Sequence, residues 1–167
     1  MSIEYIKGDL FETDCKYMAH GVNCQGIMGS GVAKIVRDRF PVNYYWYTHY
    51  AQKRLSAITD SSKLLGDVLC HNEHGAPELE NGKQWFHLFT QDVYGYDGHR
   101  FVNYEAVYNC FQTLTLIKRM SVMFPDFNEL AIPKIGAGLG GGDWDIISTI
   151  IKKTVCESGL RVKVYEL

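Results

Sequence analysis

Two glycine-rich segments are the strongest indication of a binding site in this sequence. The first runs from Asn23 to Ala33, and the second, residues 136–142, has five glycines in seven positions. Glycine adopts positive φ and lets the backbone approach a ligand closely. Each segment precedes a predicted helix, whose first N–H groups favour an anion. Two such segments suit the two phosphates of a pyrophosphate.

Either segment alone could be an ordinary turn between a strand and a helix. Ordering a glycine costs on the order of a few tenths to 1 kcal/mol relative to alanine, so a simple turn would not need five in residues 136–142. The segments match neither G-x-x-x-x-G-K-[ST] nor a full G-x-G-x-x-G. The P-loop and Rossmann interpretations are therefore weak.

Three polar residues near these segments are candidates for catalysis. His20 has a reference pKa near neutrality, which suits a general acid or a general base, although a buried histidine with satisfied nitrogens would look the same. The amide of Asn23 can orient a sugar by donating and accepting, or it can cap its own loop. Asp143 could activate water, but its position favours the N-cap of the last helix.

The composition indicates one folded domain covering residues 1–167. The chain has 46% hydrophobic and 22% charged residues and a formal charge of −2, which argues against a generally basic surface for nucleic acid. No apolar run approaches the roughly 20 residues that cross a bilayer. The five cysteines are widely spread and form no C-x-x-C pair, so we expect free thiols, a cytoplasmic location and no membrane partner.

Predicted strands alternate with predicted helices along the chain. This pattern predicts an α/β fold with a mixed, largely parallel sheet and helices on both faces. Ligands of such sheets bind beyond the carboxyl ends of the strands, where both glycine-rich segments lie. Strands are expected over residues 3–7, 16–22, 67–71, 84–90, 130–135 and 161–165, and helices over 31–40, 44–52, 104–120 (with Asn103 as N-cap) and 146–155.

From Lys7-Gly8-Asp9-Leu10 through both segments to Val164-Tyr165-Glu166-Leu167, the chain resembles macrodomains, which bind ADP-ribose in this kind of cleft. The resemblance implies a three-layer α/β/α fold over nearly the whole length. It is strongest to the ADP-ribose-1''-phosphate phosphatases. Their neighbours are the terminal ADP-ribose protein glycohydrolases and the DNA ADP-ribosyl glycohydrolase antitoxins.

The resemblance assigns roles to individual residues. Asp9 would accept a hydrogen bond from the adenine amino group, or it could be an ordinary cap. Asn23 would contact the distal ribose, and His20 stands where the phosphatase-like relatives have a histidine. Tyr165 and Leu167 would line the adenine side with Leu10, or could be core residues. The remaining ligand-binding residues would be Gly29, Ser30, Gly31 and Val32 in the first segment and Gly136, Ala137, Gly138, Leu139 and Gly140 in the second.

Two departures favour a phosphatase over a glycohydrolase. This chain has Gln91 where the glycohydrolases have a lysine, and Gly140 where the protein glycohydrolase has an aspartate. We therefore expect hydrolysis of the terminal phosphate of ADP-ribose-1''-phosphate by a monomer without metal or other cofactor. A glycohydrolase acting on ADP-ribosylated macromolecules and a non-catalytic ADP-ribose reader remain the alternatives. Residues 90–99 could cover the distal ribose.

Two further clusters are interpreted as structural. Cys70, His71 and His74 match no established zinc spacing, so a metal site is not expected there. The aromatic residues of 44–50 lack basic neighbours and are expected to pack in the core.

Overall fold

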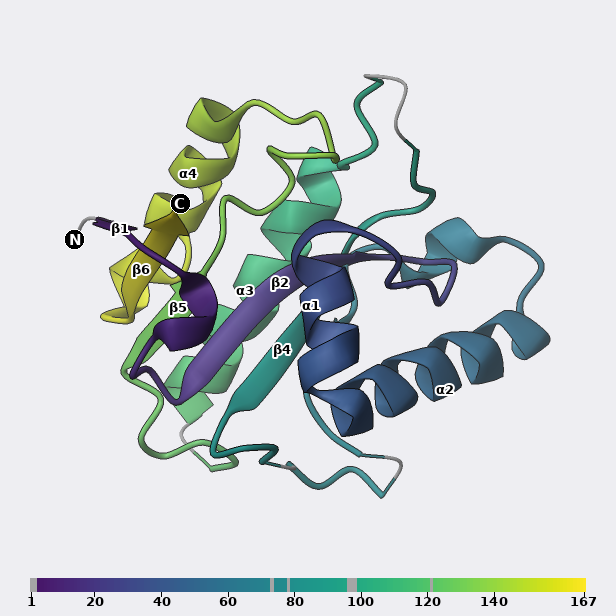
Figure 1. Ribbon diagram of the computed structural model, residues 1–167, viewed down its shortest axis with the longest axis horizontal. Coiled ribbons are helices and arrows are strands. Elements are labelled where there is room, and N and C mark those ends of the chain that lie inside the picture. The colour runs from purple at the N-terminus through teal and green to yellow at the C-terminus, as the bar shows by residue number, and fades with distance from the viewer. Residues whose placement is uncertain (1–2, 73, 78, 96–98, 121) are drawn as a thin grey trace.

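The computed structural model describes residues 3–72, 74–77, 79–95, 99–120 and 122–167 (Figure 1). Its strands are β1 (Glu4–Lys7), β2 (Tyr17–Asn23), β3 (Val68–Leu69), β4 (Gln84–Gln91), β5 (Glu129–Ile132) and β6 (Arg161–Glu166). Its α-helices are α1 (Gly31–Arg39), α2 (Pro41–Ala57), α3 (Tyr104–Met120) and α4 (Trp144–Lys153).

The strands form one sheet in the order β1-β6-β5-β2-β4-β3. All neighbouring strands are parallel except β3 and β4, which are antiparallel. The prediction of a mixed, largely parallel sheet is therefore confirmed. Because β2, β4 and β5 are parallel neighbours, the loops that follow them leave the same edge of the sheet.

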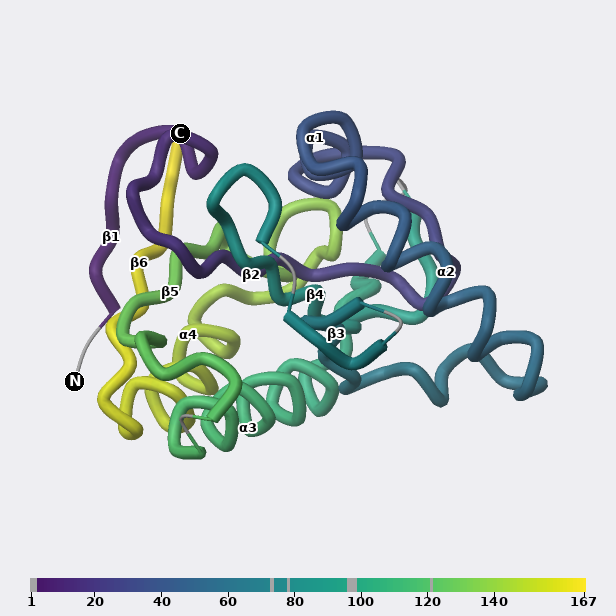
Figure 2. The backbone as a smooth tube through the Cα atoms, turned by 90° about the horizontal axis from the view of Figure 1, so that it is seen from below, coloured from purple at the N-terminus to yellow at the C-terminus, as the bar shows by residue number. Residues whose placement is uncertain are grey.

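Helices cover both faces of the sheet. Figure 2 shows α1 and α2 on one side and α3 and α4 on the other. Val36 and Tyr47 of the first pair pack in one buried cluster with Trp85. Phe111 and Ile151 of the second pair belong to the other cluster, on the opposite face. This is the three-layer arrangement expected from the sequence.

The register of β2 and β4 places two histidines side by side. His20 pairs with His87 across these parallel strands, and both side chains are buried. The register shifts between Val22 and Asn23, so the backbone of β2 changes course as the first glycine-rich loop begins.

Several element boundaries differ from the sequence predictions. Strand β5 ends at Ile132 and not at residue 135, because Pro133 has no N–H to continue the ladder. Helix α2 is longer than expected, because Pro41 is accepted in its first turn and opens it. The predicted N-cap of α3 is confirmed, since Oδ1 of Asn103 accepts a hydrogen bond from the Ala106 N–H at 2.9 Å.

The aromatic cluster of α2 is only partly in the core. Tyr47 is fully buried, whereas Tyr45 is 55% exposed, so the prediction of core packing is wrong for Tyr45. All five cysteines are buried free thiols. No helix in the described part of the chain is long and apolar enough to cross a membrane.

Candidate functional site

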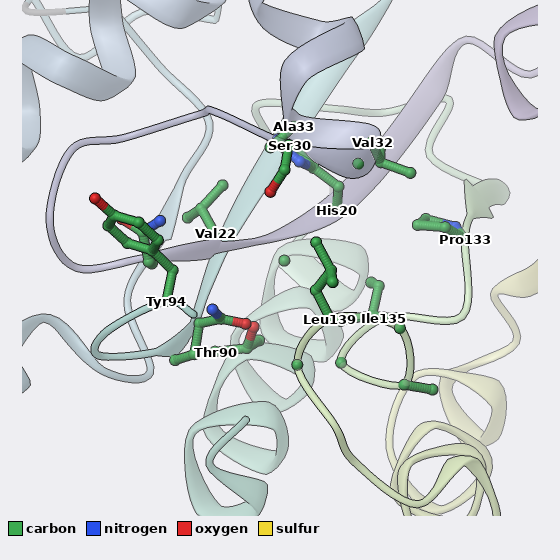
Figure 3. Close-up of a pocket in the computed structure, with 18 of the residues that line it drawn as sticks. His20, Val22, Ser30, Val32, Ala33, Thr90, Tyr94, Pro133, Ile135 and Leu139 are labelled. Atoms are coloured by element: carbon green, nitrogen blue, oxygen red, sulfur yellow. The ribbon is translucent and has the colours of Figure 1, made fainter. Parts of the chain in front are cut away.

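A cavity of about 540 Å³ opens at the carboxyl ends of β2, β4 and β5. This volume lies within the range of sites for small ligands. Figure 3 shows Ser30, Val32 and Ala33 across the cavity from Leu139 and Ile135, with Tyr94 and Thr90 to one side. The lining residues are His20–Asn23, Ile27, Gly29–Ala33, Thr90, Gln91, Tyr94, Gly95 and 133–140.

The first loop is shaped by the side chain of Asn23. Its Oδ1 accepts hydrogen bonds from the N–H of Gln25 at 2.9 Å and of Ile27 at 3.4 Å, and from the hydroxyl of Tyr47 at 2.9 Å. Its Nδ2 donates to the Ile27 carbonyl at 2.8 Å. The amide thus holds its own loop, and one N–H of Nδ2 is left for a ligand. Its predicted contact with the distal ribose stays a prediction.

A second set of side-chain bonds ties the loop to the segment after β4. Nε2 of Gln25 donates to Oδ1 of Asp92 and to Oγ of Ser61, at 3.2 and 3.1 Å. The hydroxyl of Ser61 donates to the same Asp92 oxygen at 2.5 Å. These bonds fix the outer part of the first loop, so that its inner part can face the cavity.

Helix α1 starts at the cavity wall. The side chain of Ser30, the N-cap residue, makes no capping hydrogen bond. The N–H groups of Gly31, Val32 and Ala33 in the first turn have no partner within the helix and lie where an anion is favoured. Gly31 has φ of +59° and open space at its Cβ position, so this backbone suits glycine and leaves room for a ligand.

The second loop is held by its backbone. The N–H groups of Phe101 and Val102 donate to the Gly140 carbonyl at 2.7 and 3.0 Å, and that of Gly142 donates to the Gly136 carbonyl at 2.7 Å. A Cβ on Gly136 would lie 2.6 Å from Cγ2 of Val102. A Cβ on Gly140 would lie 2.7 Å from the Gly136 carbonyl oxygen. These glycines are required because there is no space for a side chain.

The middle of the second loop is open. Among the described residues, the N–H groups of Gly138, Leu139 and Gly140 donate to no acceptor. A Cβ on Gly138 would meet no atom within 4 Å. The loop thus presents unpaired amide donors to the cavity, opposite those of the α1 N-terminus.

His20 borders the cavity but is fully buried. Its Nε2 is 2.8 Å from Nδ1 of His87. Burial, reinforced by the neighbouring His87, lowers the pKa of His20 well below its usual value. The neutral imidazole is therefore the resting form at neutral pH.

The residues predicted for the adenine side are not among those that line the cavity. Asp9 caps a short 3-10 helix through the Phe11 N–H at 3.0 Å, and Leu10 is buried in the core. The Tyr165 hydroxyl is 2.7 Å from Oγ1 of Thr13, and Leu167 is 97% exposed. Asp9 therefore has the cap role that was its alternative, and the contacts of these residues with adenine stay predictions.

Asp143 is the N-cap of α4. Its Oδ1 accepts the Asp145 N–H at 2.9 Å, and the residue is absent from the cavity lining. The placement supports the cap role and gives no support to a role in activating water.

Lys134 is the one Lys, Arg, Asp or Glu among the described lining residues. Its Nζ forms an ion pair with Oε1 of Glu166 at 2.9 Å, which links the cavity wall to the end of β6 and thus to the expected adenine side. No group of three His, Cys, Asp or Glu side chains that could hold a metal occurs among the described residues.

Part of the segment expected to cover the distal ribose does line the cavity, through Thr90, Gln91, Tyr94 and Gly95, whereas residues 96–98 lie outside the described residues. Among the described residues, the buried Thr90 hydroxyl has no hydrogen-bond partner, and a Cβ on Gly21 would lie 2.7 Å from it. Pro133 and Ile135 also line the cavity and were not predicted as site residues. Their position at the carboxyl end of a predicted strand is the feature of the sequence that points to them.

Proteins of known structure share this fold. No family model matches the chain. An ADP-ribose 1''-phosphate phosphatase of Debaryomyces hansenii is 31% identical over 181 residues, covering 98% of this chain and 98% of the relative. The macrodomain of Thermus aquaticus DarG has a TM-score of 0.75 at 24% identity and covers 99% of this chain and 98% of its own.

Thermosipho africanus DarTG, solved in complex with ADP-ribose, has a TM-score of 0.75 at 18% identity, over 98% of this chain and 41% of that longer one. The fold is that of a macrodomain. The chain belongs to the macrodomain family that includes the relatives named ADP-ribose 1''-phosphate phosphatase.

Proposed function

We propose that the protein binds ADP-ribose-1''-phosphate in this cavity and hydrolyses its terminal phosphate. The observation that carries the proposal is the pair of facing loops with unpaired amide donors, at the start of α1 and over residues 138–140. Amides aimed into a cavity hold phosphate oxygens without a cation. The relative named for this activity, aligned over nearly the whole chain, supports the choice of substrate.

The pyrophosphate would lie between the two loops. Asn23 would then orient the distal ribose with its remaining N–H, and the terminal phosphate would lie beyond this ribose in the same cavity, which His20 and Thr90 line from opposite faces of the sheet. Asp9 and Tyr165 would meet the adenine beyond the Lys134–Glu166 ion pair. Because Lys134 is already paired, the amides carry most of the attraction for the phosphates.

Hydrolysis consumes one water molecule. The water oxygen bonds to phosphorus, the bond from phosphorus to the ribosyl oxygen breaks, and that oxygen takes up a proton, which leaves ADP-ribose and inorganic phosphate. Loop amides would stabilise the charge that develops on the phosphate. His20 would assist at the hydroxyl or water beside this phosphate.

The test is release of phosphate and ADP-ribose from ADP-ribose-1''-phosphate in the presence of EDTA. We expect equal amounts of both products, with the label from ¹⁸O-water in the phosphate. His20→Ala should lose most of the turnover and keep ADP-ribose binding, whereas His71→Ala, outside the cavity, should behave as wild type. No release despite calorimetric binding of ADP-ribose would contradict the proposal and leave the reader or the glycohydrolase.

The glycohydrolase alternative is tested with the same preparation. ADP-ribosylated protein and ADP-ribosylated DNA are the substrates, and release of free ADP-ribose is measured. Gln91 stands in the cavity lining where the glycohydrolases have a lysine, so we expect no release above that of His20→Ala.

We also propose that residues 1–167 act as one monomeric domain in the cytoplasm. The five buried free thiols support a reducing compartment, because exposure to oxidant during unfolding would otherwise pair them. Light scattering after size exclusion should give the mass of one chain, and a dimer would contradict the monomer.

A further inference from the structure

A line of hydrogen-bonded side chains leads from His20 at the cavity wall across the α1–α2 face of the sheet to α2 and the turn before β4. Nε2 of His20 is 2.8 Å from Nδ1 of His87. Nε2 of His87 is 2.9 Å from Oδ1 of Asn43. Nδ2 of Asn43 donates to Oε1 of Glu80 at 2.8 Å. The last two residues are outside the cavity lining.

Glu80 determines which atom donates and which accepts at each hydrogen bond along this line of side chains. Its carboxylate also accepts the N–H groups of Val42 and Asn43, both at 3.0 Å, in the first turn of α2. An ionised carboxylate accepts hydrogen bonds and donates none. The amide of Asn43 must therefore turn its NH₂ toward Glu80 and its oxygen toward His87.

The donor and acceptor roles of the ring nitrogens of both histidines follow from this orientation of Asn43. Because Oδ1 of Asn43 accepts, Nε2 of His87 must carry the proton. A neutral imidazole has one N–H, so Nδ1 of His87 accepts and Nε2 of His20 donates.

Both rings are neutral in the resting protein. Burial lowers the pKa of His87 to about 3, and burial together with His87 lowers that of His20. With His20 protonated on Nε2, its Nδ1 bears a lone pair. This Nδ1 is buried and has no hydrogen-bond partner among the described residues. A buried polar atom without a partner is costly, so Nδ1 lacks a hydrogen-bond donor, and His20 borders the cavity that would hold one.

We propose that Glu80, Asn43 and His87 are positioning residues that hold His20 in the tautomer protonated on Nε2 and present its Nδ1 as a hydrogen-bond acceptor. Resting on the proposed function, the donor that Nδ1 meets is the attacking water or the adjacent ribose hydroxyl. His20 then orients that O–H group. A general-acid role would need a proton on Nδ1, but the single proton of the neutral His20 ring is on Nε2.

The first test measures the tautomers directly. In protein labelled with ¹⁵N-histidine, long-range ¹H–¹⁵N spectra at neutral pH should show His20 and His87 neutral and protonated on Nε2. A proton on Nδ1 of His20 would overturn the inference. This measurement needs no turnover, so an inactive protein would refute the proposed function and leave the tautomer result to decide the inference.

The second test removes the acceptor that sets the direction. Glu80→Gln keeps the size but can donate as well as accept, so both histidines should become tautomer mixtures. We expect kcat to fall by about tenfold, with KM within about twofold, because part of the population lacks an acceptor at Nδ1. Glu105→Gln, which also removes a carboxylate from the first turn of a helix, is the matched control and should change neither quantity.

Unchanged tautomers in Glu80→Gln would overturn the assignment of donors and acceptors along these hydrogen-bonded side chains. Altered tautomers with unchanged kcat would overturn its part in catalysis and leave only a structural role. Should Glu80→Gln fail to fold, the wild-type spectrum still decides the tautomer.

Discussion

The two glycine-rich loops face each other across one cavity but are held in different ways. In the first loop, the side chains of Asn23 and Tyr47 satisfy the backbone. In the second loop, backbone groups bond to one another, and Gly136, Gly140 and Gly142 fill places too small for a Cβ. Glycine therefore supplies a backbone angle at Gly31 in the first loop, and both a backbone angle and space at Gly136 in the second.

Because the two loops are held in different ways, they should tolerate different substitutions. A loop held by side chains is sensitive to loss of a donor or acceptor, and a loop held by close backbone packing is sensitive to any added methyl group. Four predictions, from the largest effect to the smallest, test this comparison.

Gly136→Ala should be the most damaging single methyl group. The residue has φ of +78°, and its Cβ would be 2.6 Å from Val102 and 3.1 Å from Ile147. We expect a loss of about 2–5 kcal/mol in the free energy of unfolding, measured by urea denaturation. Gly138→Ala in the same loop should stay within about 0.5 kcal/mol of wild type. Similar losses in both variants would contradict the comparison.

Gly138→Val should block the cavity without disturbing the fold. The new side chain enters open space at the cavity wall, where the pyrophosphate would lie. Affinity for ADP-ribose, measured by calorimetry, should fall by about 10–100-fold, equivalent to about 1.4–2.7 kcal/mol. Wild-type affinity with an unchanged melting temperature would show that the ligand lies elsewhere.

Acidification should loosen the first loop before the second. His87 has a folded-state pKa of about 3, below the value of about 6.5 in an unfolded chain. Between these pH values the unfolded chain binds more protons, so stability falls by about 1.4 kcal/mol per pH unit as the pH drops.

His20 and His87 lie on the α1–α2 face of the sheet, under the first loop. Hydrogen exchange between pH 7 and 5 should therefore show earlier loss of protection for residues 24–33 than for 136–142. His87→Gln should have a shallower fall of stability with pH. Equal loosening of both loops would place the titrating groups elsewhere.

Tyr47→Phe should have the smallest effect. The hydroxyl donates to the Asn23 carbonyl at 2.7 Å and to its Oδ1 at 2.9 Å, so its loss removes one support of the first loop. We expect about 1 kcal/mol lower stability by urea denaturation. Tyr45→Phe, in the same helix but 55% exposed, should change stability by less than about 0.5 kcal/mol. A loss in Tyr45→Phe equal to that in Tyr47→Phe would remove the special role of Tyr47.

Much of the fold could be predicted because its signals are local. Alternating strands and helices give the layers, Asn103 marks the start of α3, and glycine clusters mark the loops at the strand ends. The predicted boundaries of helices and strands differ from the observed ones where one residue has two possible effects. Pro133 ended a strand early, and Pro41, which stops one helix, also starts the next.

The site could be predicted only in part. Of the ligand-binding residues expected in the two loops, all line the cavity, whereas Asp143 caps α4 outside it. The type of a residue shows which reactions its side chain can take part in. However, a carboxylate or an amide forms hydrogen bonds with the neighbouring backbone as readily as with a ligand.

The layers, the two loops and their place at the strand ends can be predicted from the sequence, because periodicity and glycine content act over short stretches. Only the tertiary structure decided that His20 is buried against His87 and that Asn43 and Glu80, from distant parts of the chain, set its tautomer. The physical reason is that hydrogen-bond direction and burial depend on partners brought together by strand register and helix packing.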